Sequence, residues 1–139
     1  MNTQKQQKWA LGFGCQSSAS AEAIVAAVFV TLAKAKANGA VPPAYQLFTL
    51  STKAGHAASH AAAMQLGVSI GFLVPEDLRR FMDGTTHQSA LVEAVVGVGS
   101  VAEAAALAGA GHGSRLLVPR TLHGGVTCAL ATAVEGAAS

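Results

Sequence analysis

The sequence predicts one α/β domain, a three-layer α/β/α sandwich with a mixed, mostly parallel sheet of about five strands. Short apolar runs alternate with helical patterns, which favours strand, helix, strand units with parallel pairing. Hydrophobic residues make up 51% of the chain and charged residues 12%, and 139 residues fit a single core. The last two apolar runs are joined by a link too short for a crossover helix, so we expect an antiparallel pair there.

The first part of the chain predicts strand, helix, strand. Residues 9–14 are an apolar run ending in glycines, followed by a helix whose apolar residues recur every three to four positions. Ser20 is a suitable N-cap for this helix, and Asn38 with Gly39 supplies its left-handed stop. After two prolines, residues 45–50 are expected to form the second strand.

The middle of the chain continues the alternation. Residues 53–66 predict an alanine-rich helix that ends at Gly67, and residues 68–74 predict the third strand. Residues 75–77 are a proline followed by two acidic residues, a pattern typical of the start of a short helix. The polar residues 83–89 indicate a loop.

The last part predicts a helix and two strands. Residues 97–100 are a second glycine-rich turn, and Ser100 with Glu103 forms a capping box that opens a helix over residues 101–110. The two strand candidates, linked by residues 119–125, are residues 116–118 and 126–131.

Charge and cysteine content exclude several classes of function. The formal net charge is +2 and the basic residues are scattered, so no nucleic-acid partner is expected. The longest apolar stretch, residues 23–33, is too short to span a membrane, and residues 1–8 do not begin a secretory signal. Cys15 and Cys128 lie far apart and suit neither a disulfide scaffold nor a zinc knuckle. We expect a cytoplasmic protein without a metal or cofactor.

The first glycine turn is a candidate anion site. Gly12, Gly14, Cys15, Ser17 and Ser18 lie between a strand and a helix N-terminus, where backbone N–H groups and the helix dipole attract carboxylate or phosphate. The pattern is no dinucleotide fingerprint, because Ser17 stands at the third glycine position, and it lacks the Gly-Lys ending of a P-loop. A tight turn with a helix cap explains the same residues without a ligand.

The second glycine turn resembles a nucleotide signature only in part. Residues 97–102 match Gly-x-Gly-x-x-Ala, but no acid follows at the distance that would bind a ribose. The capping box accounts for Ser100 without a ligand, so a structural role for Gly99 and Ser100 is favoured over a nucleotide site.

The reactive side chains give weaker signals. A nearby helix N-terminus would lower the pKa of Cys15, yet no histidine is placed by sequence as its base, so a packed or ligand-contacting thiol is the default. Cys128 is expected in the core. His56 and His60 share one helical face, where a polar stripe is favoured over a metal site.

Two isolated cations complete the set of candidates. Lys53 stands at a predicted helix start, and Arg120 lies just beyond a predicted strand end. Each is commonly a solvated charge, but at a loop end either side chain can meet an acidic group of a ligand.

Four segments stand out when they are taken in order: Gly12-Phe13-Gly14-Cys15, Thr49-Leu50-Ser51-Thr52-Lys53, the run from Glu93 through Gly97-Val98-Gly99-Ser100 to Leu107, and Leu116-Leu117-Val118-Pro119-Arg120 with Gly124-Gly125-Val126-Thr127. As an ordered set, they resemble the CobE and CbiG C-terminal family of cobalamin biosynthesis. Gln16 stands where the family usually has a basic residue, and residues 54–57 replace an acid-rich segment.

This resemblance implies that the chain binds or processes a carboxylated corrinoid or precorrin intermediate, with other cobalamin-pathway enzymes as further candidate partners. A flat, largely apolar ring edged by carboxylates would need close backbone approach, N–H groups and cations. No catalytic residue is identified. The candidate substrate-binding residues are Gly12, Gly14, Cys15, Ser17, Ser18, Lys53, Gly99, Ser100 and Arg120.

Three alternatives remain open from the sequence. The resemblance to CbiG implies a precorrin lactone hydrolase-type enzyme, in which Cys15 or a loop histidine would assist attack by water. A second alternative is a protein-docking module of the pathway without a ligand of its own. A generic nucleotide-binding domain is disfavoured by the two incomplete glycine signatures.

Overall fold

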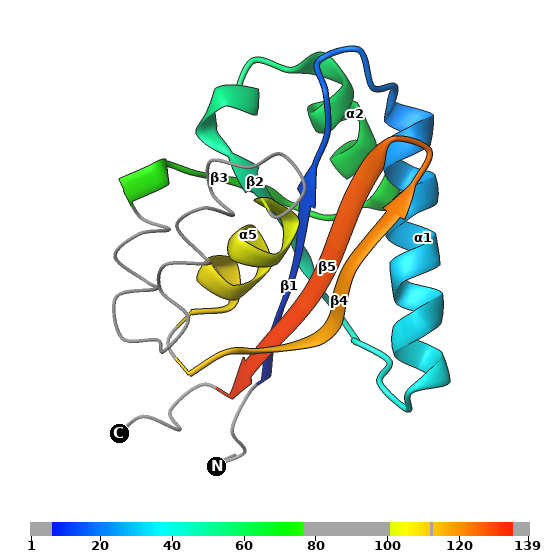
Figure 1. Cartoon of the computed structure of the whole chain (residues 1–139), viewed down its shortest axis with the longest axis vertical. Helices are drawn as coiled ribbons and strands as arrows, with labels where there is room; N and C mark the ends of the chain where they lie inside the picture. The colour runs from blue at the N-terminus through cyan, green and yellow to red at the C-terminus, as the bar shows by residue number, and fades with distance from the viewer. Residues whose placement is uncertain (1–6, 77–100, 112, 135–139) are drawn as a thin grey trace.

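Five strands form one sheet in the order β3-β2-β1-β5-β4 (Figure 1). The computed structural model describes residues 7–76, 101–111 and 113–134, and the fold is given for these residues. The strands are β1 (Gln7–Gly14), β2 (Gln46–Leu50), β3 (Ile70–Leu73), β4 (Arg115–His123) and β5 (Val126–Val134).

The sheet is mixed, with one strand reversed. β1 pairs parallel with β2, and β2 pairs parallel with β3, whereas β5 is antiparallel to both of its neighbours, β1 and β4. Four strands therefore run in one direction and only β5 opposes them. This confirms the predicted mixed, mostly parallel sheet, and the carboxyl ends of β1 and β2 lie at the same edge.

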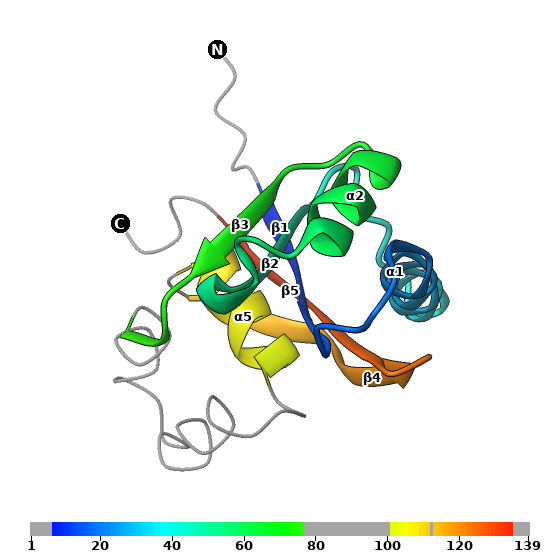
Figure 2. The same cartoon turned by 90° about the horizontal axis from the view of Figure 1, so that it is seen from above.

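Helices cover both faces of the sheet (Figure 2). α1 (Ala21–Ala37) and α2 (Ala57–Leu66) lie on one face, and α5 (Val101–Ala110) lies on the other. The core between the sheet and the first pair includes Leu11, Phe13 and Ile24, and the core under α5 is built mainly of alanines with Phe48. The predicted three-layer α/β/α architecture is confirmed.

α5 lies unusually close to the sheet because glycines remove the side chains that would separate them. A Cβ atom on Gly12 would overlap the carbonyl oxygen of Ala102 and the nitrogen of Ala106. On the same face, the ring of Phe48 occupies the space beside Gly71 and Gly109. The backbone of α5 therefore rests directly on β1, with one aromatic ring filling the remaining gap.

Both ends of α1 and the C-terminal end of α2 form as the sequence predicts. The Ser20 hydroxyl accepts a hydrogen bond of 3.1 Å from the Ala23 N–H at the start of α1. Asn38 follows the last residue of α1, and Gly39 has φ of 86°. Gly67 ends α2 with φ of 70°. Glycine is favoured at both stops because a side chain is strained at positive φ.

Two predicted boundaries are wrong. α2 begins at Ala57 rather than at Lys53, because Ser51–Lys53 forms a short 3-10 helix, η1, before the chain turns at Gly55. β4 continues to His123, so the expected seven-residue link is only the two-glycine turn of a hairpin. An edge strand tolerates Pro119 at an irregularity of the ladder, and the register of β4 shifts on both sides of Val118.

Several expectations lie outside the described residues. These are the loop at residues 83–89, the glycine turn at residues 97–100 and most of the short helix after β3, of which Pro75 and Glu76 are described as helical. Among the described residues, no helix combines the length and the apolar character needed to cross a membrane.

A candidate ligand-binding cleft at the carboxyl end of β1

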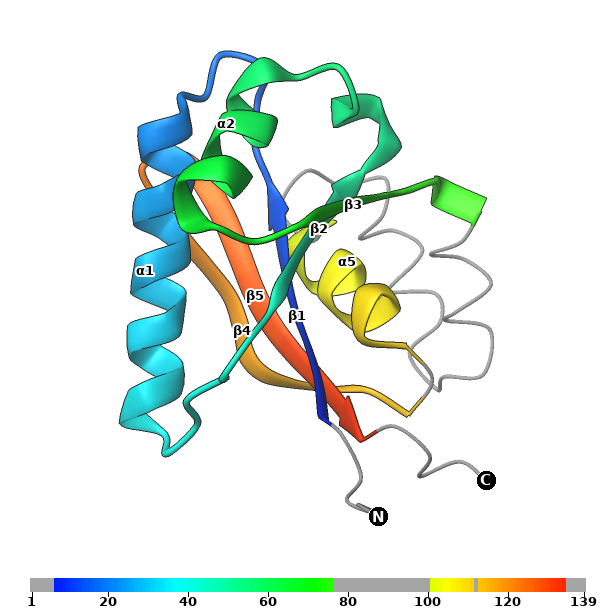
Figure 3. The same ribbon diagram turned by 180° about the vertical axis from the view of Figure 1, so that it is seen from behind.

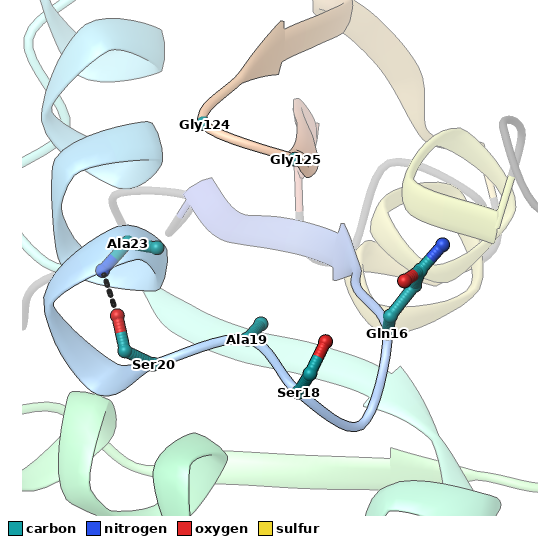
Figure 4. Close-up of a pocket in the computed structure, with 7 residues that line it drawn as sticks. All are labelled: Gln16, Ser18, Ala19, Ser20, Ala23, Gly124 and Gly125. Atoms are coloured by element: carbon teal, nitrogen blue, oxygen red, sulfur yellow. Dashed lines mark hydrogen bonds between the residues drawn. The ribbon is translucent and has the colours of Figure 1, made fainter.

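Two adjoining hollows lie where β1 ends. The main cleft, of about 560 Å³, is lined by Gly14, Cys15, Gln16, Arg120, Leu122, Gly125 and Thr127. The side cleft, of about 380 Å³, is lined by Gln16, Ser18, Ala19, Ser20, Ala23, Gly124 and Gly125. Figure 4 shows the loop from Gln16 to Ser20 facing the Gly124 and Gly125 turn across the side cleft. The shared residues Gln16 and Gly125 make the two clefts neighbours.

The backbone at the end of β1 is held by hydroxyl groups from both neighbouring strands. Thr49 on β2 donates a hydrogen bond of 2.8 Å to the Phe13 carbonyl oxygen, and Thr127 on β5 donates one of 3.3 Å to the Gly14 carbonyl oxygen. These carbonyl oxygens would repel an anion if they were unpaired. The hydroxyl groups engage both oxygens in hydrogen bonds. This lowers the electrostatic repulsion that a carboxylate would meet at the Gly14 end of the main cleft.

Cys15 is a half-buried thiol packed against the core on the α1 side of the sheet. Burial raises the pKa of Cys15 above its ordinary value of 9.0, and the nearby positive charge of Lys53 opposes this rise in part. The expectation that a helix N-terminus lowers the pKa of Cys15 is therefore wrong, because desolvation by burial has the largest effect on this pKa and raises it. Cys15 faces the cleft as a neutral thiol, and Cys128 is fully buried as expected.

The two candidate cations come from different elements, and only Arg120 is among the residues that line the main cleft. Lys53, in η1 after β2, lies near enough to Cys15 for its charge to act on the thiol. Arg120 lines the main cleft from within β4, rather than just beyond a strand end as predicted. Its backbone N–H donates a 2.8 Å hydrogen bond to Oε2 of Glu103 on α5.

Sequence reasoning missed the role of His56. Its Nε2 lies 3.0 Å from the Ser17 carbonyl oxygen and its Nδ1 lies 2.7 Å from the Ser59 hydroxyl. Because a carbonyl only accepts, Nε2 carries a proton and donates to Ser17, while Nδ1 shares a hydrogen bond with the Ser59 hydroxyl. His56 thus clamps the first loop to α2, a long-range contact for which the sequence has no signal.

His60 is also engaged by its surroundings. Its Nε2 lies 2.6 Å from the Ala54 carbonyl oxygen, and its ring lies 5.2 Å from that of Phe72. Within residues 7–76, 101–111 and 113–134, no group of three histidines, cysteines or acids is arranged to hold a metal ion. The two histidines of the predicted polar stripe therefore hold loops in place.

The structure brings together part of the predicted site. Gly14, Cys15 and Arg120 line the main cleft, Ser18 lines the side cleft, and Lys53 lies beside Cys15. Ser17 contributes its carbonyl oxygen to the His56 clamp instead.

Of the three other predicted site residues, the structure describes only Gly12, which does not line either cleft. Gly12 is covered by the backbone of α5, which explains the glycine by packing rather than by approach of a ligand. Gly99 and Ser100 lie outside the described residues, although Val101, which follows them, lies beside Gly14. The sequence had not singled out Gln16, Leu122 or Thr127 as cleft residues.

Comparison with known proteins gives consistent matches over most of the chain. The family described as "Cobalamin synthesis G C-terminus" matches residues 9–131. Protein CobE of Sinorhizobium sp. is 34% identical over 122 residues, covering 87% of this chain and 77% of that protein.

Two crystal structures are also similar. A cobalamin biosynthesis protein, chiG, of Agrobacterium tumefaciens shares 35% identity with a TM-score of 0.64, covering 88% of this chain and 96% of that one. CobE, described as a protein from the cobalamin (vitamin B12) biosynthetic pathway, superimposes with a TM-score of 0.74 at 24% identity, covering 96% of this chain and 98% of that one. At that identity, the second match bears on the fold alone.

Proposed function

Because the chain belongs to the family of cobalamin synthesis G C-terminal proteins, we propose that it binds a carboxylated corrin-ring precursor in the main cleft. The observation that carries the proposal is the convergence of Gly14, Cys15 and Arg120 on one open hollow at the end of β1, with Lys53 near enough for its charge to act on Cys15. Ligands of open α/β sheets bind at the carboxyl ends of strands, which is where this hollow lies.

The lining of the main cleft suits a flat ring with an anionic edge. Leu122 is 71% exposed and offers an apolar contact surface beside the hollow. Arg120 presents a guanidinium group, which pairs with carboxylates through two parallel hydrogen bonds. Gly14 and Gly125 carry no side chain, so their backbone permits close approach of a ring.

The side cleft extends the same surface toward the start of α1. Its lining contains the Ser18 hydroxyl and the first turn of α1, whose dipole is positive at that end. A macrocycle with several carboxylates is larger than either hollow, so we propose that it lies across both. In this arrangement the ring faces the main cleft, and one peripheral carboxylate reaches the start of α1.

The state of Cys15 supports binding rather than catalysis by this residue. A raised pKa leaves the thiol protonated near neutral pH, so it is a poor nucleophile and a poor base. His56 donates from Nε2 to the Ser17 carbonyl oxygen and its Nδ1 is hydrogen-bonded to the Ser59 hydroxyl, so both ring nitrogens are engaged. The lactone hydrolase-type alternative therefore receives no support from these two side chains.

A visible-absorption titration of the purified chain with late corrin intermediates tests the proposal. We expect saturable binding without conversion of the spectrum. Lys53→Ala combined with Arg120→Ala should weaken binding about tenfold or more, because two charge-assisted contacts are lost. The matched control is Lys8→Ala combined with Arg115→Ala, which removes two cations at the starts of β1 and β4 and should leave the affinity unchanged.

Each other outcome has a defined meaning. Equal affinities for the double variant and the wild type would remove both cations from the site. Conversion of the spectrum that disappears in Cys15→Ala would support the hydrolase-type enzyme. A titration without any change, together with capture of a purified cobalamin-pathway enzyme, would support the docking module and overturn the binding proposal.

A further inference from the structure

The outward side of α1 exposes a large apolar side chain at its middle, with charged residues toward both ends. The inward face of the helix buries Ile24, Val28 and Thr31 against the sheet. On the opposite side, Phe29 is 57% exposed, which is unusual for an aromatic side chain at the middle of a helix. Figure 3 shows α1 at the edge of the molecule, with one side against the sheet. An exposed aromatic side chain with alanines on either side of it along the helix offers a surface that a second partner can bury.

The two charged residues at the ends of this outward face are placed symmetrically about Phe29. α1 spans Ala21–Ala37, so Phe29 is its central residue. At about 100° per residue, the positions that share its side of the helix come three, four and seven residues away. Of these positions, Val25 and Leu32 pack partly against the core, and the others form the α1 face, as it is called hereafter: Glu22, Ala26, Phe29, Ala33 and Lys36.

The two ends of the α1 face carry opposite charges. Glu22 lies seven residues before Phe29, and Lys36 lies seven residues after it. If two copies of α1 pack antiparallel about a two-fold axis at Phe29, Glu22 of each copy lies opposite Lys36 of the other. Such an isologous contact forms both charge pairs at once, while Ala26 and Ala33 let the helices approach closely.

A groove beside the α1 face adds apolar surface to this contact. It has a volume of about 310 Å³ and lies between the second half of α1 and residues 40–45. Leu32 and Tyr45 contribute to its lining, together with Val41, which is 67% exposed. In the antiparallel pair, the first half of the other α1 lies over this groove and covers its apolar lining.

We propose that the α1 face is the interface of an isologous homodimer in which two α1 helices pack antiparallel at Phe29. Glu22 and Lys36 of one α1 face are complementary to Lys36 and Glu22 of an identical α1 face. The partner that fits is therefore a second copy of this chain. One helix face with its groove is small beside the roughly 800 Å² per partner of a standard interface. We therefore expect the dimer to dissociate on dilution.

Analytical ultracentrifugation over a concentration series tests this proposal without any ligand. The wild type should approach twice the chain mass of 13.9 kDa at high concentration and the single chain mass on dilution. Phe29→Glu should raise the dissociation constant tenfold or more, because it places like charges at the axis. Met64→Glu is the matched control, because Met64 is 81% exposed on α2 and should leave the dimer intact.

A charge-reversal series tests the antiparallel register. Glu22→Lys alone and Lys36→Glu alone should each weaken the dimer, since each places like charges opposite one another. The double variant should restore it, because the opposite charges are then exchanged. Far-UV circular dichroism checks that Glu22→Lys, which disfavours the first turn of α1, leaves the helix intact.

Three results would overturn the proposal: a wild type that stays at the single chain mass at every concentration, a dimer insensitive to Phe29→Glu, or a double reversal that does not restore association. The first result would leave the α1 face to a partner of another sequence, and the last would show that the two helices do not pack in this antiparallel register. None of these results bears on corrinoid binding, so this proposal and the proposed function fail separately.

Discussion

Glu103 on α5 accepts a 2.8 Å hydrogen bond at Oε2 from the backbone N–H of Arg120 on β4. The contact joins the first turn of the helix on one face of the sheet to its edge strand. It lies next to Pro119, which has no N–H, and within the part of β4 whose register is irregular. Glu103 thus supplies a partner where the strand ladder is interrupted, and it fixes the backbone from which Arg120 reaches the main cleft.

We expect Glu103→Ala to lower the free energy of unfolding by about 1 kcal/mol, since it leaves the Arg120 N–H without this acceptor. Glu103→Gln keeps an acceptor oxygen and should lose less than half of that stability. Urea unfolding followed by circular dichroism measures both variants. Equal losses in the two variants would mean that the charge of Glu103, rather than the hydrogen bond, stabilises this junction.

The alternation of apolar runs and helical patterns was sufficient to predict the architecture. The positions of α1, α5 and the first three strands follow from periodicity and from helix stops such as Gly39 and Gly67, which are local signals. The extent of β4 could not be predicted from such local signals, because Pro119 and Arg120 look like loop residues. Only the edge position of β4 and its irregular register make this sequence compatible with a strand.

The cleft was predictable only in part. Gly14, Cys15 and Ser18 could be assigned because a turn between a strand and a helix lies at a known edge of the sheet. Gly12 belongs to the same glycine motif, but its role depends on α5 lying over it, a contact between residues far apart in the chain. The clamp of His56 on Ser17 is equally non-local.

The packing role of Gly12 gives a stability prediction. In Gly12→Ala the added methyl group would overlap backbone atoms of Ala102 and Ala106, which cannot move without displacing α5. We expect a loss of about 3 kcal/mol or more in the free energy of unfolding. Gly55→Ala is the matched control, since no atom lies within 4 Å of its Cβ position, and it should change stability by less than about 1 kcal/mol. Similar effects of the two substitutions, measured by urea unfolding, would contradict the close packing of α5 on β1.

The hairpin turn gives a second conformational prediction. Gly124 has φ of 60° and Gly125 has φ of 81°, the pair of positive values typical of a type I′ turn. Gly124→Asn should therefore change the free energy of unfolding by less than about 0.5 kcal/mol, because asparagine tolerates this conformation. Gly124→Val should cost about 1 to 2 kcal/mol through backbone strain. A thermal melt of both variants distinguishes them, and a valine variant as stable as the wild type would show that the turn relaxes freely.

The raised pKa values of the two cysteines predict how thiol reactivity and the stability of the protein change with pH. Burial raises the pKa of Cys15 above 9.0, so its alkylation by iodoacetamide should be slower than that of a free thiol near neutral pH and should accelerate at alkaline pH. Lys53→Ala removes the charge that lowers this pKa, so the reaction at a given pH should become slower still. Lys36→Ala, remote from Cys15, is the control, and mass spectrometry of the modified peptides separates the two cysteines.

The buried thiol of Cys128 limits how far the pH can be raised in this experiment before the fold loses stability. Burial raises the pKa of Cys128 from 9.0 to about 12, so the neutral thiol stabilises the fold below pH 9.0, and this contribution is lost as the pH rises toward 12. The free energy of unfolding should therefore fall across that window, and Cys128 should be alkylated only when the protein unfolds. Alkylation of Cys15 faster than that of a free thiol near neutral pH would mean that its pKa is lowered instead. The proposal that the cleft binds its ligand beside a neutral thiol would then have to be replaced by one in which Cys15 reacts.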